Sequence, residues 1–137
     1  MTDIYTCAKK HYDWAVNLRR YFHVHPELSG QEYKTQEKIC QELQLLGVPF
    51  YKAAKTGVIA EIKGGKPGKT IAIRTDIDAL PLQDECGQSY QSQNKGACHA
   101  CGHDGHMAVL FGTIRILNDL KADLAGTFRF LFQPSEE

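Results

Sequence analysis

Residues 97–106 have the sequence Ala97-Cys98-His99-Ala100-Cys101-Gly102-His103-Asp104-Gly105-His106, and an apolar helical pattern over 107–120 follows directly. The stretch holds two thiols, three imidazoles and one carboxylate, side chains that bind borderline-soft divalent metals. The helical pattern lies between two apolar strand patterns, 70–74 and 127–132. This strand–helix–strand order predicts a right-handed parallel crossover, with the thiol and imidazole groups just before its helix.

Acidic pairs follow both strands of this predicted crossover. Asp76 and Asp78 come directly after the first strand, and Glu136 and Glu137 come a few residues after the second. Because the carboxyl ends of parallel strands meet at one edge of a sheet, we expect both pairs to lie beside the Cys101 segment. Carboxylates, a thiol and an imidazole that converge in this way suit a hydrolytic site with two metal ions, where one further carboxylate serves as general base.

The remaining regular patterns predict two more helices and a hairpin. An amphipathic helix covers about 5–23, and the capping-box pattern Ser29-Gly30-Gln31-Glu32 predicts the start of a second helix, which Gly47 ends. The strand patterns 56–62 and 70–74 flank a glycine-rich turn, so we expect them to pair as a hairpin.

Two segments are less regular. His23 and His25 invite a metal-binding interpretation, but no carboxylate or thiol beside them in the sequence completes a site. We therefore expect a polar loop against the core or near the cleft, where Pro26 ends the first helix. Residues 81–96 are polar without a strong period, which predicts a loop near the metal site.

The pair Cys98 and Cys101 admits other interpretations. A structural zinc site needs a second pair of ligands at suitable spacing, and Cys86 stands isolated in the sequence. A pair of redox thiols would not require the segment 102–106 behind it. The residues alone therefore leave a metallohydrolase, a structural zinc site and redox thiols open.

Composition excludes several classes of partner. The 137 residues suit one domain with a hydrophobic core, and 16 basic against 16 acidic residues leave no formal net charge. Neither a nucleic acid nor a membrane is therefore an expected partner, and no apolar run is long enough for a transmembrane helix. The five cysteines are irregularly spaced and residues 1–5 lack the pattern of a secretory signal, so a cytoplasmic location is expected.

Four segments, in order along the chain, are similar to the motifs of one known family. They resemble those of the dinuclear metal amidohydrolases and metallopeptidases that include hippurate hydrolases, N-acyl-amino-acid amidohydrolases and auxin-conjugate hydrolases. The segments are Arg19–Ser29, Arg74–Pro81, His99–His106 and Phe132–Glu137. The resemblance implies an α/β fold of the zinc-exopeptidase type: a three-layer sandwich with a mixed, mostly parallel sheet and flanking helices, here incomplete.

The resemblance also implies residue roles and a reaction. Cys101, His103 and Glu137 match ligands of two divalent metal ions, for which manganese, zinc, cobalt and nickel remain open. Glu136 matches the general base that takes a proton from the attacking water and passes it to the leaving amine. The implied reaction is hydrolysis of the amide bond of an N-acyl amino acid or a peptide-like small molecule. Orienting roles around the metals are expected for Asp76, Asp78, His99 and Asp104.

Members of this family are much longer than the present chain. Two further histidine ligands and a smaller dimerisation and lid domain follow the glutamate motif in them, so we expect residues 1–137 to be the N-terminal part of a catalytic domain. The parent enzyme is expected to be a homodimer or homotetramer. The isolated piece is expected to be inactive and to self-associate through an unpaired edge of the strand 127–132. The alternatives are a non-catalytic binding or assembly module and a structural-zinc domain.

Overall fold

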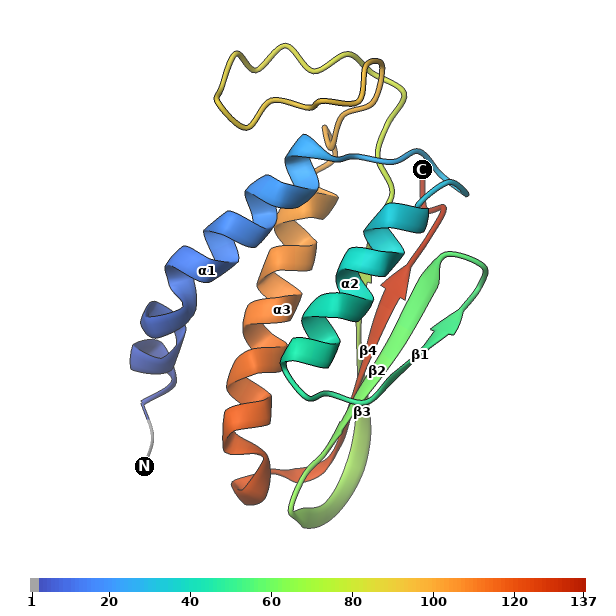
Figure 1. Cartoon of the computed structure of the whole chain (residues 1–137). Coiled ribbons are helices and arrows are strands. Elements are labelled where there is room, and N and C mark those ends of the chain that lie inside the picture. The colour runs from blue at the N-terminus through green and yellow to red at the C-terminus, as the bar shows by residue number, and fades with distance from the viewer. Residues whose placement is uncertain (1–2) are drawn as a thin grey trace.

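The computed structural model describes residues 3–137. Met1 and Thr2, which open the segment assessed for a secretory signal, lie outside the described residues. Within residues 3–137, no helix has the length and apolarity needed to cross a membrane. The elements of the described chain (Figure 1) are α1 Ile4–Val24, α2 Tyr33–Leu45, β1 Phe50–Ala53, β2 Gly57–Lys63, β3 Lys66–Asp76, α3 His103–Leu120, the 3₁₀ helix η1 Lys121–Asp123 and β4 Ala125–Gln133.

The strands form one mixed sheet in the order β1-β2-β4-β3. β2 pairs antiparallel with β1 and with β4, whereas β4 pairs parallel with β3. The predicted hairpin between 56–62 and 70–74 is therefore wrong, because β4 lies between these two strands. The central position suits β4, because its Phe130 and Phe132 are almost fully buried.

β1 is a strand that the sequence analysis missed. Phe50 pairs with Ala60 of β2, and Tyr51 pairs with Ile59. Aromatic residues favour strands, but an element of four residues is too short to show a clear period of two. Its pairing with β2 therefore decides that it is a strand.

The predicted parallel crossover is confirmed. β3 and β4 pair in parallel register, with Ile73 opposite Phe130 and Asp76 opposite Gln133, and α3 connects them. α3 begins at His103, four residues before the apolar pattern that predicted it, because Gly102 takes a left-handed φ of 88° and turns the chain into the helix. His103 therefore stands in the first turn of α3.

The unpaired edge was predicted for the wrong strand. β4 has a hydrogen-bonded neighbour on each side, so 127–132 is internal to the sheet. Among the described strands, β1 and β3 lie at the two edges. Within the described chain, β3 is therefore the parallel strand that lies at an edge of the sheet, with one row of backbone N–H and C=O groups unpaired by another strand.

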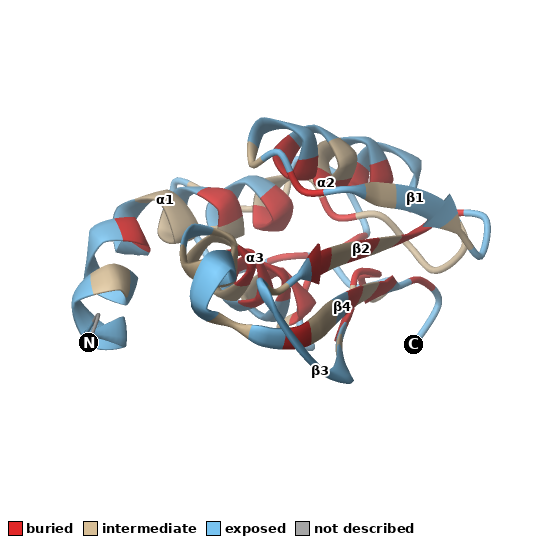
Figure 2. Cartoon of the chain, turned by 90° about the horizontal axis from the view of Figure 1, so that it is seen from below, coloured by how far each residue is buried: buried red, intermediate tan, exposed pale blue. Residues whose placement is uncertain are grey.

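The helices cover one face of the sheet, and the core lies between the two layers (Figure 2). Val58 and Ala60 of β2 are buried, whereas Ile59 between them points to the other face and is partly exposed. Phe111 of α3 anchors the core, with its ring centroid 5.1 Å from that of Phe132. The α/β class and the mixed sheet are confirmed. Within the described residues the helices form a single layer, and antiparallel pairings outnumber the parallel one.

The helix boundaries correct one prediction and confirm two. α1 matches the predicted helix, and Gly47, with φ +65°, follows the end of α2 as predicted. The capping box at Ser29 is wrong, because α2 begins at Tyr33. The Ser29 hydroxyl instead donates a hydrogen bond of 2.6 Å to Oδ2 of Asp78, far along the chain. The Ser29 side chain, which the local pattern assigned to a helix cap, therefore makes a tertiary contact instead.

Candidate metal centre

The ends of β3 and β4 and the start of α3 bring the predicted ligands together. The thiol of Cys101, a ring nitrogen of His103 and a carboxylate oxygen of Glu137 lie within 4.8 Å of one another. Asp76, His103 and Glu136 form a second group with the same spacing, so His103 joins the two groups. Because β3 and β4 are parallel, they deliver their carboxylates to the same edge of the sheet, where α3 begins.

The orientation of His103 is set by one backbone contact. Its Nδ1 lies 2.9 Å from the carbonyl oxygen of Asp78, which can only accept, so Nδ1 carries the proton. The lone pair is thereby left on Nε2, which lies 3.7 Å from Glu136 Oε2 and 3.8 Å from Glu137 Oε1. A histidine held by one nitrogen presents the other as a metal ligand.

Asp78 is a buried residue that contacts two members of the centre, His103 and Glu137. Its carboxylate is wholly buried, and Oδ2 accepts hydrogen bonds from the Ser29 hydroxyl at 2.6 Å and the Glu137 backbone N–H at 3.0 Å. Burial opposes ionisation, but these hydrogen bonds and nearby His103 outweigh it and hold the pKa of Asp78 below its usual range. Asp78 thus contacts both the His103 ring and the backbone of Glu137, and its orienting role stays a prediction.

Glu32 is a residue of the site's support that the sequence analysis assigned to a helix cap. It is wholly buried, and Oε1 accepts the backbone N–H of Ser135 at 2.9 Å. Oε2 accepts the hydroxyl of Thr56 at 2.7 Å. Glu32 therefore ties the segment that carries Glu136 and Glu137 to the body of the fold. No periodicity in the sequence signals this contact.

The Cys101 thiol lies in an acidic environment. Its hydrogen bond with Glu137 raises its pKa most, and the charges of Glu137, Glu136 and Asp76 raise it further. Concentrated negative charge favours the neutral thiol in the absence of a cation. A bound divalent ion reverses that preference, because it stabilises the thiolate and the carboxylates together.

The donor set fits a borderline divalent metal. Thiolate and imidazole ligands suit zinc, cobalt and nickel, and carboxylates also suit manganese. Cys101 is exposed at the surface and the Glu136 side chain is 40% exposed, so within the described residues the centre is open to solvent. That openness is typical of a catalytic site, since structural zinc sites are closed by four protein ligands.

His99 and Asp104, for which orienting roles were predicted, lie outside both groups of ligands. His99 is buried, and neither ring nitrogen finds a hydrogen-bond partner within residues 3–137. Asp104 contacts α1: its Oδ2 lies 2.8 Å from Arg19 Nε and 2.7 Å from His23 Nδ1. Asp104 therefore joins the start of α3 to α1, and the orienting roles of both residues stay predictions.

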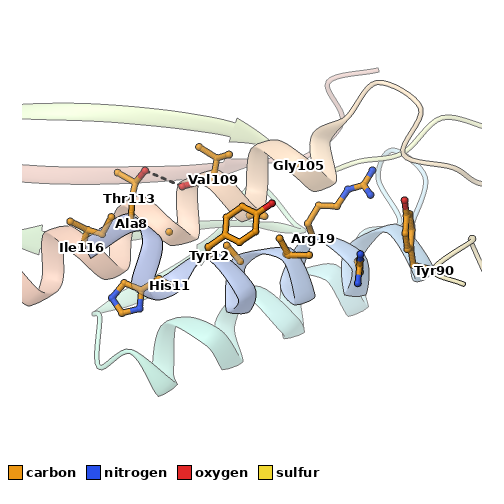
Figure 3. Close-up of a pocket in the computed structure, with 14 residues that line it drawn as sticks. Ala8, His11, Tyr12, Arg19, Tyr90, Gly105, Val109, Thr113 and Ile116 are labelled. Carbon is orange, nitrogen blue, oxygen red and sulfur yellow. Dashed lines mark hydrogen bonds between the residues drawn. The ribbon is translucent and has the colours of Figure 1, made fainter. Parts of the chain in front are cut away.

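One hollow of the described chain lies away from this centre. A groove of about 560 Å³ runs between α1 and α3, and Tyr12 and Val109 are among the residues that line it (Figure 3). Both residues belong to apolar helical patterns, yet Tyr12 is 66% and Val109 is 70% exposed. Within the part of the chain that the structure describes, none of the residues lining this groove is a predicted metal ligand. The groove is therefore separate from the candidate centre.

Comparison with known proteins shows which family the chain resembles. The profile of the peptidase family M20/M25/M40 matches residues 72–137. The chain also resembles the crystal structure of the Bacillus subtilis YXEP protein, a dinuclear metal-binding peptidase of the M20 family. The TM-score is 0.89 at 48% identity, covering 93% of this chain and 36% of that one. The chain therefore carries the M20 profile over residues 72–137 and is similar in fold to an M20 peptidase.

Curated relatives of the chain are named for amide hydrolysis. N-acetylcysteine deacetylase of Bacillus subtilis (strain 168) is 50% identical over 127 residues, which are 89% of this chain and 33% of the relative. N-acyl-L-amino acid amidohydrolase of Geobacillus stearothermophilus is 48% identical over 120 residues, covering 87% and 32%. The resemblance drawn from the four motifs is confirmed. The chain spans about a third of the length of these relatives.

Proposed function

We propose that the chain is part of a metal-dependent amidohydrolase that cleaves the amide bond of N-acyl amino acids or peptide-like small molecules. The observation that carries the proposal is the group of Cys101, His103 and Glu137, whose ligand atoms lie within 4.8 Å of one another. The names of the two curated relatives point to the same substrate class.

In this proposal, different residues of the chain bind the metal ions, act as the general base and orient a ligand. Cys101, His103 and Glu137 hold two divalent ions, which when bound polarise the substrate carbonyl as Lewis acids. Glu136 is the general base, which takes a proton from the attacking water and gives it to the leaving amine. Its Oε2 lies 3.7 Å from His103 Nε2 and its side chain is 40% exposed, a position beside the centre and open to substrate. Asp78 keeps His103 in the required tautomer.

We further propose the properties of the whole protein that the resemblance implies. The substrate is hippurate or a related N-acyl amino acid, the ions are manganese, zinc, cobalt or nickel, and the location is the cytoplasm. Residues 1–137 supply the N-terminal part of the catalytic domain of a homodimer or homotetramer. The isolated chain self-associates, and the exposed strand edge that supports this is β3.

A chimera tests the proposed function. Residues 1–137 replace the matched third of the Bacillus subtilis N-acetylcysteine deacetylase, and hydrolysis of N-acetylcysteine is followed with added Mn²⁺ or Zn²⁺. The chimera is expected to be active, and Glu136→Gln is expected to lower kcat by about 100- to 10,000-fold. Glu37→Gln, which alters an exposed carboxylate on α2, is the matched control and should leave kcat unchanged. A folded Glu136→Gln chimera with full activity would exclude Glu136 as the base.

Chelation separates the amidohydrolase from the two alternatives. EDTA is added to the chimera, and both circular dichroism and turnover are followed. Loss of turnover with the fold intact supports the enzyme. Unfolding on chelation indicates a structural zinc domain. A folded chimera that neither binds metal nor turns over substrate indicates a non-catalytic module.

A further inference from the structure

A second group of potential metal ligands connects α1 to the loop between β3 and α3. His23 of α1 and Asp84 and Cys86 of the loop offer ligand atoms within 4.8 Å of one another. Figure 1 shows this loop passing over the end of α1. The group shares no residue with the Cys101 centre. The sequence analysis found no carboxylate or thiol beside His23, whereas the fold supplies one of each.

The ring of His23 is oriented from one side only. Its side chain is 8% exposed, and Nδ1 lies 2.7 Å from Oδ2 of Asp104. That oxygen is also paired with Arg19 Nε at 2.8 Å, and it accepts the proton of Nδ1. In the neutral ring the lone pair is then on Nε2, the arrangement that prepares a histidine for metal binding.

The other nitrogen of His23 is the unsatisfied atom of this group. Nε2 lies 3.2 Å from Asp84 Oδ2, but within residues 3–137 it has no partner aligned for a hydrogen bond. A buried lone pair that faces a carboxylate oxygen is repelled by it unless a cation lies between them. The ring therefore lacks a positive partner on this side.

Two of the three ligand-to-ligand spacings match those of tetrahedral coordination. Zinc bonds of about 2.3 Å to sulfur and 2.0–2.2 Å to nitrogen and oxygen place a sulfur and an oxygen ligand about 3.5 Å apart, and a nitrogen and an oxygen about 3.4 Å apart. Cys86 Sγ lies 3.5 Å from Asp84 Oδ2, and His23 Nε2 lies 3.2 Å from the same oxygen. The third pair, the Cys86 thiol and a His23 ring nitrogen, lies within 4.8 Å, and its two atoms would approach each other when the three ligands close around one ion.

The carboxylate of this group is held ionised by its own loop. Asp84 Oδ2 accepts the Ser92 backbone N–H at 2.8 Å, and Oδ1 accepts that of Cys86 at 3.0 Å. Of these bonds, that from Ser92 contributes most to lowering the pKa of Asp84, to about 2. Cys86 is exposed, so a water molecule has access to the fourth coordination position.

We propose that His23, Asp84 and Cys86 form a second metal site, which takes one borderline-soft divalent cation of the zinc type. The bound ion joins the loop after β3 to the end of α1. Through His23 and Asp104 it also braces the first turn of α3. This site is independent of the proposed amidohydrolase reaction, because none of its ligands belongs to the Cys101 centre.

Cobalt substitution tests this site on the chain 1–137. Cys101→Ser is introduced first, so that the other centre contributes no thiolate. The Cys101→Ser chain is then titrated with Co²⁺, the sulfur-to-cobalt charge-transfer absorption is recorded, and Zn²⁺ is added in competition. One equivalent of Co²⁺ is expected to give the band and Zn²⁺ to displace it. Absence of the band in this chain would overturn the proposal.

Three further substitutions locate the ligands. In the Cys101→Ser chain, Cys86→Ser is expected to abolish the band, and the exposed position of Cys86 means that the fold is retained. His23→Gln keeps the thiol and is expected to weaken Co²⁺ binding at least about tenfold. Cys98→Ser alters a buried thiol of the same loop and should keep the band. A band that survives Cys86→Ser, or Co²⁺ affinity unchanged by His23→Gln, would contradict the assignment.

Discussion

His99 combines burial with two ring nitrogens that have no hydrogen-bond partner within residues 3–137. Burial disfavours the charged ring and lowers the pKa of His99 from 6.5 to about 4. Between these two pH values the unfolded chain binds a proton that the folded chain does not. The free energy of unfolding therefore falls as the pH drops from 6.5 towards 4, by about 1.4 kcal/mol per pH unit and on the order of 3 kcal/mol in all.

Urea unfolding at several pH values, with EDTA present to keep the chain free of metal, measures this slope. His99→Gln is expected to reduce the slope between pH 6.5 and 4, whatever it does to the stability at pH 7. His106→Gln alters an exposed histidine in the nearby first turn of α3 and should leave the slope unchanged. A wild-type slope in His99→Gln would show that His99 is not the group that titrates.

Glu32 is the residue whose loss should damage both stability and the site. Glu32→Ala leaves the Thr56 hydroxyl and the Ser135 N–H without their acceptor, which is expected to cost about 2–4 kcal/mol in the free energy of unfolding. Because Ser135 precedes the acidic pair, metal affinity should fall as well. Urea unfolding and Zn²⁺ titration measure the two effects. Glu37→Ala, at an exposed position of α2, which follows Glu32, should change neither by a measurable amount.

β3 is the element that carries the risk of association. It pairs with β4 on one side, and Ile71 on it is 53% exposed. A flat, exposed strand edge is a template for a second copy, and a lysine on such an edge opposes pairing. Sedimentation of the wild-type chain is therefore expected to depend on concentration, and Ile71→Lys is expected to weaken the association at least about tenfold.

The control for this prediction introduces the same charge away from the sheet. Leu45 of α2 is 80% exposed, so Leu45→Lys removes exposed apolar surface without touching an edge. It should associate as the wild type does. Equal effects of Leu45→Lys and Ile71→Lys would indicate association through general apolar contact, and a wild-type chain that stays monomeric would contradict the prediction outright.

For the whole molecule, the prediction concerns the metal affinity and the hydrolytic activity of residues 1–137 on their own. The described centre offers one thiol, one imidazole and a few carboxylates, and the resemblance assigns two further histidine ligands to the longer relatives. The isolated chain is therefore expected to bind Mn²⁺ and Zn²⁺ weakly and to show little or no hydrolysis of hippurate or N-acetylcysteine. Calorimetric titration and amino-acid release measure both quantities. Turnover near that of the chimera would refute the expectation.

The sequence predicted the candidate ligands of the site better than the residues that hold the ligand segments in place. Cys101, His103 and the acidic pairs were recognisable because metal ligands are few in kind and because parallel strands end at one edge. Ser29 and Glu32 were misassigned, since a capping pattern is satisfied by neighbours and gives no sign of a distant partner. Their contacts with Asp78 and Ser135 depend on the folded sheet.

By itself, the sequence predicted the candidate donor set and determined the α/β class, the parallel crossover and the resemblance to a known family. These follow from side-chain chemistry, hydrophobic period and the order of elements, all of which are local or topological properties of a chain. Only the tertiary structure decided that β4 separates β2 from β3 and that Asp84 and Cys86 approach His23. Such pairings join residues far apart in sequence, and they are selected by the burial of a shared core, to which every element contributes at once.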